Sequence, residues 1–270
     1  MKLGFGALDD TVDERDKLYP ARDLVGATPV KTLAMELIPH VYVDKRLGWC
    51  NQHHSSACVG YAITQTIWTY LSSLGIKQQY GSPIGLYFHA IARSRGWHSV
   101  TDDGSQPRHA WESIRELGLI PFSSHPIGAS SWGDVAARVC SHPAPDCYRQ
   151  AIDMDWIRYH WIMSYGAECK REMQQTLSSG RPFAASFTLG EDFFDWQLSN
   201  GPYRRKSKVA GYHYMPCVGY DQGGVWCANS HGIGFGQMGY VLISWDTMVS
   251  VETRSKAVPD VNLPAGQCHA

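Results

Sequence analysis

Net charge is almost absent from this chain of 270 residues, in which 24 Lys and Arg face 25 Asp and Glu. Binding to nucleic acid through the release of counterions needs a strongly basic face. The one dense basic cluster consists of Arg204, Arg205, Lys206 and Lys208. We interpret this cluster as a solvated loop and expect no nucleic-acid partner.

Long apolar runs are absent too. No stretch approaches the roughly 18 uninterrupted apolar residues that identify a membrane-spanning helix. At the N-terminus, Asp9 and Asp10 follow before the apolar region of a secretion signal could form. We therefore expect no membrane partner and no signal peptide, and a protein that is cytoplasmic or particle-associated.

The eight cysteines lack the Cys-x-x-Cys pairs that are typical of zinc sites. Cys140, His142 and Cys147, with Cys169 further along, offer soft ligands without that spacing. A zinc-stabilised interaction module is a minor alternative, and we expect no metal and no organic cofactor. An even number of cysteines would also suit four disulfides, so the redox state of the thiols stays open.

The order of the patterns predicts an α+β fold. Apolar residues recur at helical spacing from Val59 to Leu74 and again from Gln106 to Leu117, each run being followed by glycine. The segment from Arg149 to Ser179 is expected to be mostly helical or irregular. Short strand-like runs follow and are expected to pair antiparallel; they cover Phe183–Leu189, Tyr212–Tyr220, Val225–Ala228 and Gly239–Trp245.

Cys58 lies immediately before the first predicted helix. A thiol at a helix N-terminus is close to the positive end of the helix dipole and to unpaired backbone N–H groups, both of which favour the thiolate. Gln52 lies six residues earlier and could donate an amide hydrogen to a developing oxyanion, together with the backbone N–H of Cys58. A nucleophile and an oxyanion hole would then come from one short segment.

Two later segments could complete this chemistry. His213 lies at the mouth of an apolar strand, where it could act first as general base and then as general acid. Asn229 follows the next strand and could accept a hydrogen bond from the His213 ring, which would fix its tautomer. The sequence thus predicts a Cys-His-Asn triad. Rapid alkylation of Cys58 near pH 5 to 6 would indicate a thiolate-imidazolium pair, whereas reaction only near pH 8 and above would favour a structural role.

These motifs resemble those of the papain-like (family C1) cysteine peptidases. The family's Gln, five residues and then Cys at a helix start match Gln52 and Cys58. Its His followed five residues on by Val-Gly-Tyr matches His213, and its Asn-Ser-x-Gly matches the segment that begins at Asn229. An Asp-Gly-Ser turn at 103–105 and a Gly-Leu-Ile-Pro segment at 118–121 resemble the bacterial and viral branch.

The resemblance implies a papain-like fold with two lobes and a cleft between them. We expect an N-terminal strap over residues 1–40 and a peptidase domain over 41–270, with a helical lobe at about 41–140 and a β-rich lobe at about 141–270. The implied activity is hydrolysis of a polypeptide substrate through an acyl-enzyme, for which transpeptidation is a near neighbour. Only 51 residues precede Gln52, too few for a long inhibitory propeptide.

His231 is the main departure from the family pattern. It stands where the family has a Trp that shields the hydrogen bond between Asn and His from water. This replacement leaves a second hypothesis open, in which the chain is a catalytically weak or inactive papain-like component of a phage particle or a secretion assembly. From the resemblance alone, we expect His231→Trp to leave the activity equal or higher.

Overall fold

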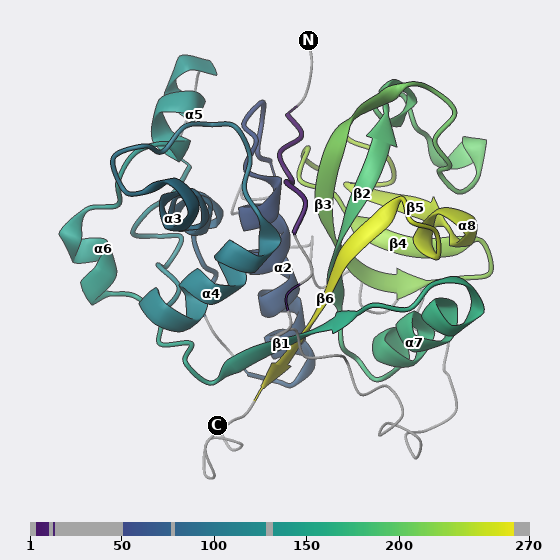
Figure 1. Cartoon of the computed structure of the whole chain (residues 1–270), viewed down its shortest axis with the longest axis horizontal. Helices are drawn as coiled ribbons and strands as arrows, with labels where there is room; N and C mark the ends of the chain where they lie inside the picture. Colours follow the sequence, from purple (N-terminus) through teal and green to yellow (C-terminus); the bar gives the residue numbers. More distant parts are fainter. Residues whose placement is uncertain (1–3, 11–12, 14–50, 77–78, 128–131, 262–270) are drawn as a thin grey trace.

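The computed structural model of the chain describes residues 4–10, 13, 51–76, 79–127 and 132–261 (Figure 1). The predicted strap is therefore described only at residues 4–10 and 13. Cys50 and Cys268 lie outside the described residues.

Helices make up one side of the molecule in Figure 1. They are α2 (Cys58–Ser73), α3 (Pro83–Arg95), α4 (Pro107–Leu117), α5 (Trp132–Val139) and α6 (Pro145–Arg149). Helix α2 is buried along almost its whole length, because it lies between the other helices and the sheet. Its first residue, Cys58, is thereby placed where the two sides of the molecule meet.

A six-stranded sheet forms the other side, with the order β1-β6-β2-β3-β4-β5 and antiparallel pairing throughout. Its strands are β1 (Ile157–Ile162), β2 (Phe183–Gly190), β3 (Val209–Tyr220), β4 (Gly224–Ala228), β5 (Tyr240–Ser244) and β6 (Thr253–Val261). The helices α7 (Gly166–Ser178) and α8 (Trp245–Met248) flank this sheet, as do short 3₁₀ turns at Glu191–Phe193 and Leu198–Asn200.

The predicted α+β fold is confirmed, with helices first and antiparallel strands later. The helices expected at 59–74 and 106–117 correspond to α2 and α4, and the four expected strands correspond to β2 to β5. The prediction for Arg149 to Ser179 misses β1, which pairs with β6 in register from Ile157 opposite Val261 to Ile162 opposite Lys256. Neither α3 nor β6 was expected from the patterns.

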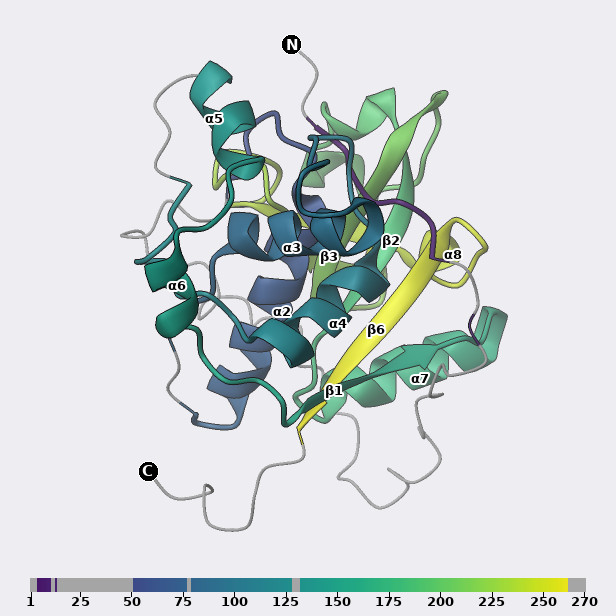
Figure 2. The same cartoon turned by 60° about the vertical axis from the view of Figure 1, so that its left-hand side comes forward.

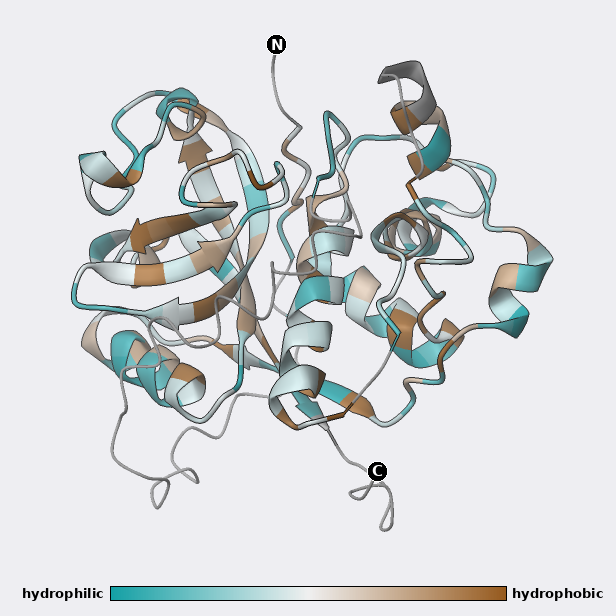
Figure 3. Ribbon diagram, turned by 180° about the vertical axis from the view of Figure 1, so that it is seen from behind, coloured by the Kyte–Doolittle hydropathy of each residue, from teal (hydrophilic) through white to brown (hydrophobic). Residues whose placement is uncertain are grey.

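Separate apolar clusters fill the interior. One lies within the β-rich side and includes Phe183, Phe187 and Trp245, and another joins α2 and α4 to the sheet through Ile63, Trp111 and other residues. In Figure 3 the hydrophobic residues are concentrated on the strands, whereas the connecting loops are largely hydrophilic. Helix α2 contributes to this second cluster and, through Tyr61, to a further cluster shared with α3 and α5, and burial of this apolar surface stabilises the position of the helix that begins at Cys58.

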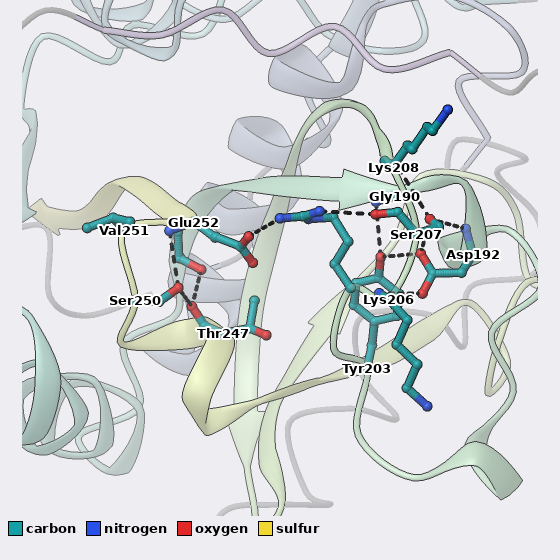
Figure 4. Close-up of polar contacts among 12 residues, drawn as sticks. Gly190, Asp192, Tyr203, Lys206, Ser207, Lys208, Thr247, Ser250, Val251 and Glu252 are labelled. Carbon is teal, nitrogen blue, oxygen red and sulfur yellow. Dashed lines mark hydrogen bonds and ion pairs between the residues drawn. The ribbon is translucent and has the colours of Figure 1, made fainter.

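The basic cluster at 204–208 is paired with acidic groups. Arg205 forms an ion pair with Glu252, and Arg204 pairs with Asp246. Asp192 accepts hydrogen bonds from the backbone N–H of Lys206 at 2.9 Å and from the Ser207 hydroxyl at 2.5 Å (Figure 4). The acidic partners neutralise much of the positive charge that binding to nucleic acid would need.

Helices in the described part of the chain are too short or too polar to cross a membrane.

A buried histidine in α3 has a consequence for acid stability. His89 is 2% exposed, and its Nε2 lies 3.0 Å from the hydroxyl of Tyr148. Burial, with smaller effects from His125 and His142, lowers the pKa of His89 from 6.5 to about 4. As the pH falls below 6.5 the unfolded chain therefore binds a proton before the folded chain does, so the free energy of unfolding falls between pH 6.5 and about 4.

We expect His89→Gln to reduce this acid sensitivity, because glutamine cannot take up the proton. The loss of melting temperature between pH 7.5 and 4.5 should be smaller than in the parent chain by roughly 3 °C or more. Thermal unfolding followed by circular dichroism measures this difference. His98→Gln, at an exposed position, is the control and should keep the parent's pH dependence; an equal loss in the His89 variant and the parent would contradict the prediction.

Candidate active site

Cys58 is the first residue of α2 and is completely buried. Backbone groups of Gly6, Val59 and Tyr214 hydrogen-bond to its sulfur. Tyr214 belongs to β3 and directly follows His213, so the stretch of β3 that carries His213 also lies beside the Cys58 sulfur.

His213 and Asn229 form a buried pair, as the sequence predicts. The Nε2 atom of His213 lies 2.8 Å from Oδ1 of Asn229, and both side chains are completely buried. The Nδ1 atom of His213 has no hydrogen-bond partner among the described residues. With Nε2 donating to Asn229, Nδ1 carries the lone pair that a general base needs.

Gln52 joins the segment before Cys58 to the segment that carries Asn229. Its backbone N–H donates to the carbonyl of Ser230 at 2.7 Å, and the Ser230 hydroxyl donates to its side-chain oxygen. Its amide nitrogen donates to the carbonyl of Ser55 at 2.7 Å and to the carbonyl of Gly4 at 3.1 Å. The hydrogen that would meet an oxyanion is therefore occupied by the N-terminal segment.

Residues 4–10 of the predicted strap run between the helices and the sheet across this site (Figures 1 and 2), and from here on the strap means these residues alone. The strap binds both walls through its backbone. Ala7 N–H donates to the carbonyl of Tyr212 at 3.2 Å, while Ser105 N–H donates to the carbonyl of Gly6 at 2.8 Å and Leu8 N–H donates back to Ser105 at 3.0 Å. The strap thus covers Cys58 in the folded chain.

Phe5 of the strap fills an aromatic pocket beside His213. Its ring stacks on Phe194 with centroids 5.0 Å apart and lies 5.3 Å from the ring of His213 and 6.4 Å from that of His231. A cavity of about 530 Å³ continues beyond this pocket, lined by residues 194–199 and 234–237.

The strap approaches the Cys58 segment so closely that only glycine fits at two positions. A Cβ atom on Gly4 would lie 2.1 Å from the carbonyl oxygen of Ser55, and one on Gly6 would lie 1.9 Å from that of Ser56. Both opposing atoms are backbone, so a rotamer change cannot relieve the clash. The close fit of the strap therefore depends on these two glycines.

Two acidic residues anchor the C-terminal end of the strap. The carboxylate of Asp10 lies 3.3 Å from the backbone N–H of Arg108 at the start of α4, where helices leave unpaired N–H groups. Asp9 forms an exposed ion pair with Arg254 at 2.7 Å, and its carbonyl accepts from the Gln106 amide at 3.0 Å. Because exposed ion pairs contribute little, the helix contact is the stronger anchor.

Burial under the strap makes the candidate nucleophile and base electrically neutral. Desolvation raises the pKa of Cys58 to about 11, although backbone hydrogen bonds oppose the rise. Desolvation likewise lowers the pKa of His213 to about 4, against the effect of its hydrogen bond with Asn229. At neutral pH the covered site therefore holds a thiol and an uncharged imidazole, and not the reactive thiolate expected from the sequence.

The six described cysteines are all free thiols. Cys217 and Cys227 face each other across β3 and β4 with their sulfurs 3.6 Å apart. In the described ranges no group of three or more His, Cys, Asp or Glu side chains could hold a metal ion, and this includes the cysteines considered for a zinc module. Cys147 instead donates to the carbonyl of Ser124 at 3.4 Å.

All four residues predicted for the site, Gln52, Cys58, His213 and Asn229, lie in this one buried region. Sequence reasoning missed the contacts of the strap, although Gly4 and Gly6 are a visible signal for close backbone approach. It also read His231 only as a lost Trp, whereas His231 hydrogen-bonds to Asn229.

The fold is that of the papain-like cysteine proteases. Xylellain, a cysteine protease from Xylella fastidiosa, is similar with a TM-score of 0.75 and 20% identity over 96% of this chain and 97% of that one. A procathepsin B from Trypanosoma congolense is similar with a TM-score of 0.68 and 16% identity over 96% and 86%. A cysteine protease from Carica candamarcensis in complex with E-64 follows with 0.55 and 18% over 90% and 97%. No protein-family model matches the chain, and no curated protein matches it in sequence.

We expect Gly6→Val to displace the strap and expose Cys58, because the valine Cβ has no space beside Ser56. A fall of the Cys58 pKa from about 11 toward the ordinary value of a thiol should increase its rate of alkylation at pH 7 by about 10-fold to 100-fold. Iodoacetamide labelling with peptide mass spectrometry measures this rate for each cysteine.

Leu8→Ala is the matched control, since it lies on the same strap and its side chain is 37% exposed. It should leave the labelling of Cys58 slow. Rapid labelling of Cys58 in the parent chain would show instead that the strap does not protect the thiol.

Proposed function

We propose that this chain, with its papain-like fold, is a cysteine peptidase that hydrolyses peptide bonds through Cys58, His213 and Asn229. The observation that carries the proposal is the buried hydrogen bond between His213 Nε2 and Asn229 Oδ1, at the site where the backbone next to His213 contacts the Cys58 sulfur. The arrangement supports a base held in the tautomer that can accept the thiol proton.

The proposed reaction begins once the strap has left the site. His213 Nδ1 takes the proton of Cys58, and the thiolate attacks the carbonyl carbon of the scissile peptide. The Gln52 amide and the N–H of Cys58 donate to the oxyanion, a position for which the Gly4 carbonyl 3.1 Å from Gln52 provides a guide. His213 then protonates the leaving amine, and water releases the acyl group from Cys58.

Control by the strap is part of this proposal. The strap uses the Gln52 donor, contacts the Cys58 sulfur and fills the aromatic pocket beside His213. A substrate needs the same donors and the same space, so the covered chain and the substrate-bound chain exclude each other. The short strap would thus do what a long propeptide does in cathepsin-type zymogens.

The aromatic pocket gives an indication of substrate preference. Phe5 occupies it while the preceding carbonyl, that of Gly4, lies at the Gln52 donor. A substrate with an aromatic residue after the scissile bond would find the same stacking surface on Phe194. The preference follows if a substrate places its scissile carbonyl where the Gly4 carbonyl lies and its next residue where Phe5 lies.

The test uses the full chain with Gly6→Val, incubated with fluorescein-labelled casein. We expect release of labelled peptides and modification of Cys58 by E-64, the compound bound in the Carica candamarcensis protease. Adding Cys58→Ala should reduce the hydrolysis by about 10³-fold or more, because it removes the sulfur that would form the acyl-enzyme.

Cys147→Ala, which removes another buried thiol, is the control and should hydrolyse casein like its parent. Retention of hydrolysis by the Cys58 variant would remove Cys58 as the nucleophile. Rapid alkylation of Cys58 without any peptide release would favour the inactive structural component over the peptidase.

A further inference from the structure

His231 stands between the triad and the strap. It is 9% exposed, and its ring stacks on that of His213 with centroids 5.0 Å apart and an angle of 5° between the planes. Its Nδ1 atom lies 3.1 Å from the side-chain nitrogen of Asn229, and its Nε2 atom lies 3.4 Å from the carbonyl oxygen of Gly4.

The directions of these hydrogen bonds follow from Ser230. The backbone N–H of Ser230 is a donor only, and it lies 2.9 Å from Asn229 Oδ1. The oxygen of Asn229 is thereby identified, and its Nδ2 is the group that faces His231. An amide nitrogen can only donate, so His231 Nδ1 must accept.

The tautomer of His231 is fixed as a result. Its proton lies on Nε2 and is directed at the carbonyl of Gly4. Burial, with a smaller effect from His213, lowers the pKa of His231 to about 3, so the ring stays neutral and keeps its Nδ1 lone pair.

We propose that His231 is a positioning residue that holds the Asn229 amide in the orientation that His213 requires. The inference rests on the proposed function of the triad. If the amide turned over, its NH₂ group would face His213 Nε2, which would then have to accept. The His213 proton would move to Nδ1, and Nδ1 could no longer take the proton of Cys58.

An acceptor for the Asn229 amide matters because the pair is buried. A buried NH₂ group without a partner loses the hydrogen bonds that water would give it, and this cost is larger than the net value of the bond itself. His231 satisfies the amide from the side opposite Ser230, so the correct orientation is satisfied at both ends. The turned-over amide would oppose its NH₂ to the Ser230 N–H.

The family's Trp cannot supply this contact, since an indole nitrogen is a donor only. The replacement by His therefore exchanges shielding by a large ring for a direct hydrogen bond to Asn229. This reverses the expectation from the resemblance, and we expect His231→Trp to impair the site.

Three variants of His231 distinguish the effect of its hydrogen-bond acceptor, Nδ1, from the effect of its aromatic ring. His231→Phe keeps an aromatic ring against His213 and loses the acceptor. His231→Asn loses the ring and retains an oxygen near the position of Nδ1, and His231→Trp restores the family's residue. All are made in the full chain with Gly6→Val, with His98→Gln as the distant control.

Inactivation by E-64 supplies two constants, the limiting rate and the half-saturating concentration. We expect His231→Phe and His231→Trp to lower the limiting rate about 10-fold, with the half-saturating concentration unchanged within about twofold. The limiting rate of His231→Asn should lie within about threefold of that of the chain with Gly6→Val alone. A Phe variant as fast as the parent, or an Asn variant as slow as Phe, would overturn the proposal.

A spectroscopic measurement tests His231 independently of the triad's activity. In ¹⁵N NMR spectra of the imidazole nitrogens at pH 7, the parent should show His213 protonated on Nε2, whereas the Phe variant should show a shift toward Nδ1. Unchanged His213 signals in the Phe variant would overturn the role of His231. Absence of E-64 labelling in the chain that carries Gly6→Val alone, with this shift present, would instead count against the peptidase alone.

Discussion

The hydrogen bonds between Gln52 and Ser230 hold the two halves of the site together. The helical side supplies Cys58 and the sheet supplies His213 and Asn229, so their alignment depends on how the segment before α2 meets the segment after β4. Gln52 binds Ser230 through both its backbone and its side chain, while Ser230 in turn donates to Asn229. One buried network therefore fixes both the Gln52 amide and the Asn229 side chain that faces His213, and such a network is rigid because each member satisfies the next.

Solvent access determines the charge state of this network. Under the strap, desolvation outweighs both the helix N-terminus and the backbone donors at Cys58, so the thiol is favoured. The same burial keeps His213 neutral despite Asn229. Cys58 and His213 are thus both uncharged in the covered form, and access of water to the two side chains is what would change their charge state.

Much of the fold could be predicted from local patterns, and the failures have physical causes. The pattern at Val59–Leu74 predicts α2, and glycine-bounded apolar runs predict β2 to β5. Helix α3 is buried on nearly all sides, so it shows no polar stripe that would reveal a helical period. Strands β1 and β6 carry Arg158, Lys256 and other polar residues, and their pairing over about a hundred residues leaves no local signal.

The candidate residues of the site could be predicted for a different reason. Cys58, His213 and Asn229 each lie in a short motif whose spacing resembles that of the papain-like peptidases. The contacts of His231 and of the strap, by contrast, form only when segments distant in the sequence meet. The sequence shows that His231 differs from the family's Trp, but it does not show what His231 does. That depends on which atom of the Asn229 amide faces His231, and the hydrogen bond from the Ser230 N–H to Asn229 Oδ1 identifies this atom as Nδ2.

The anchoring of the strap links the opening of the site to the stability of the fold. Its hydrogen bonds reach Ser105 and Arg108 on the helical side and Tyr212 on the sheet, so the segment that covers the site also connects its two walls. A chain that releases the strap loses these hydrogen bonds at the same time as it exposes the site. The opened form is consequently less stable towards unfolding than the covered form.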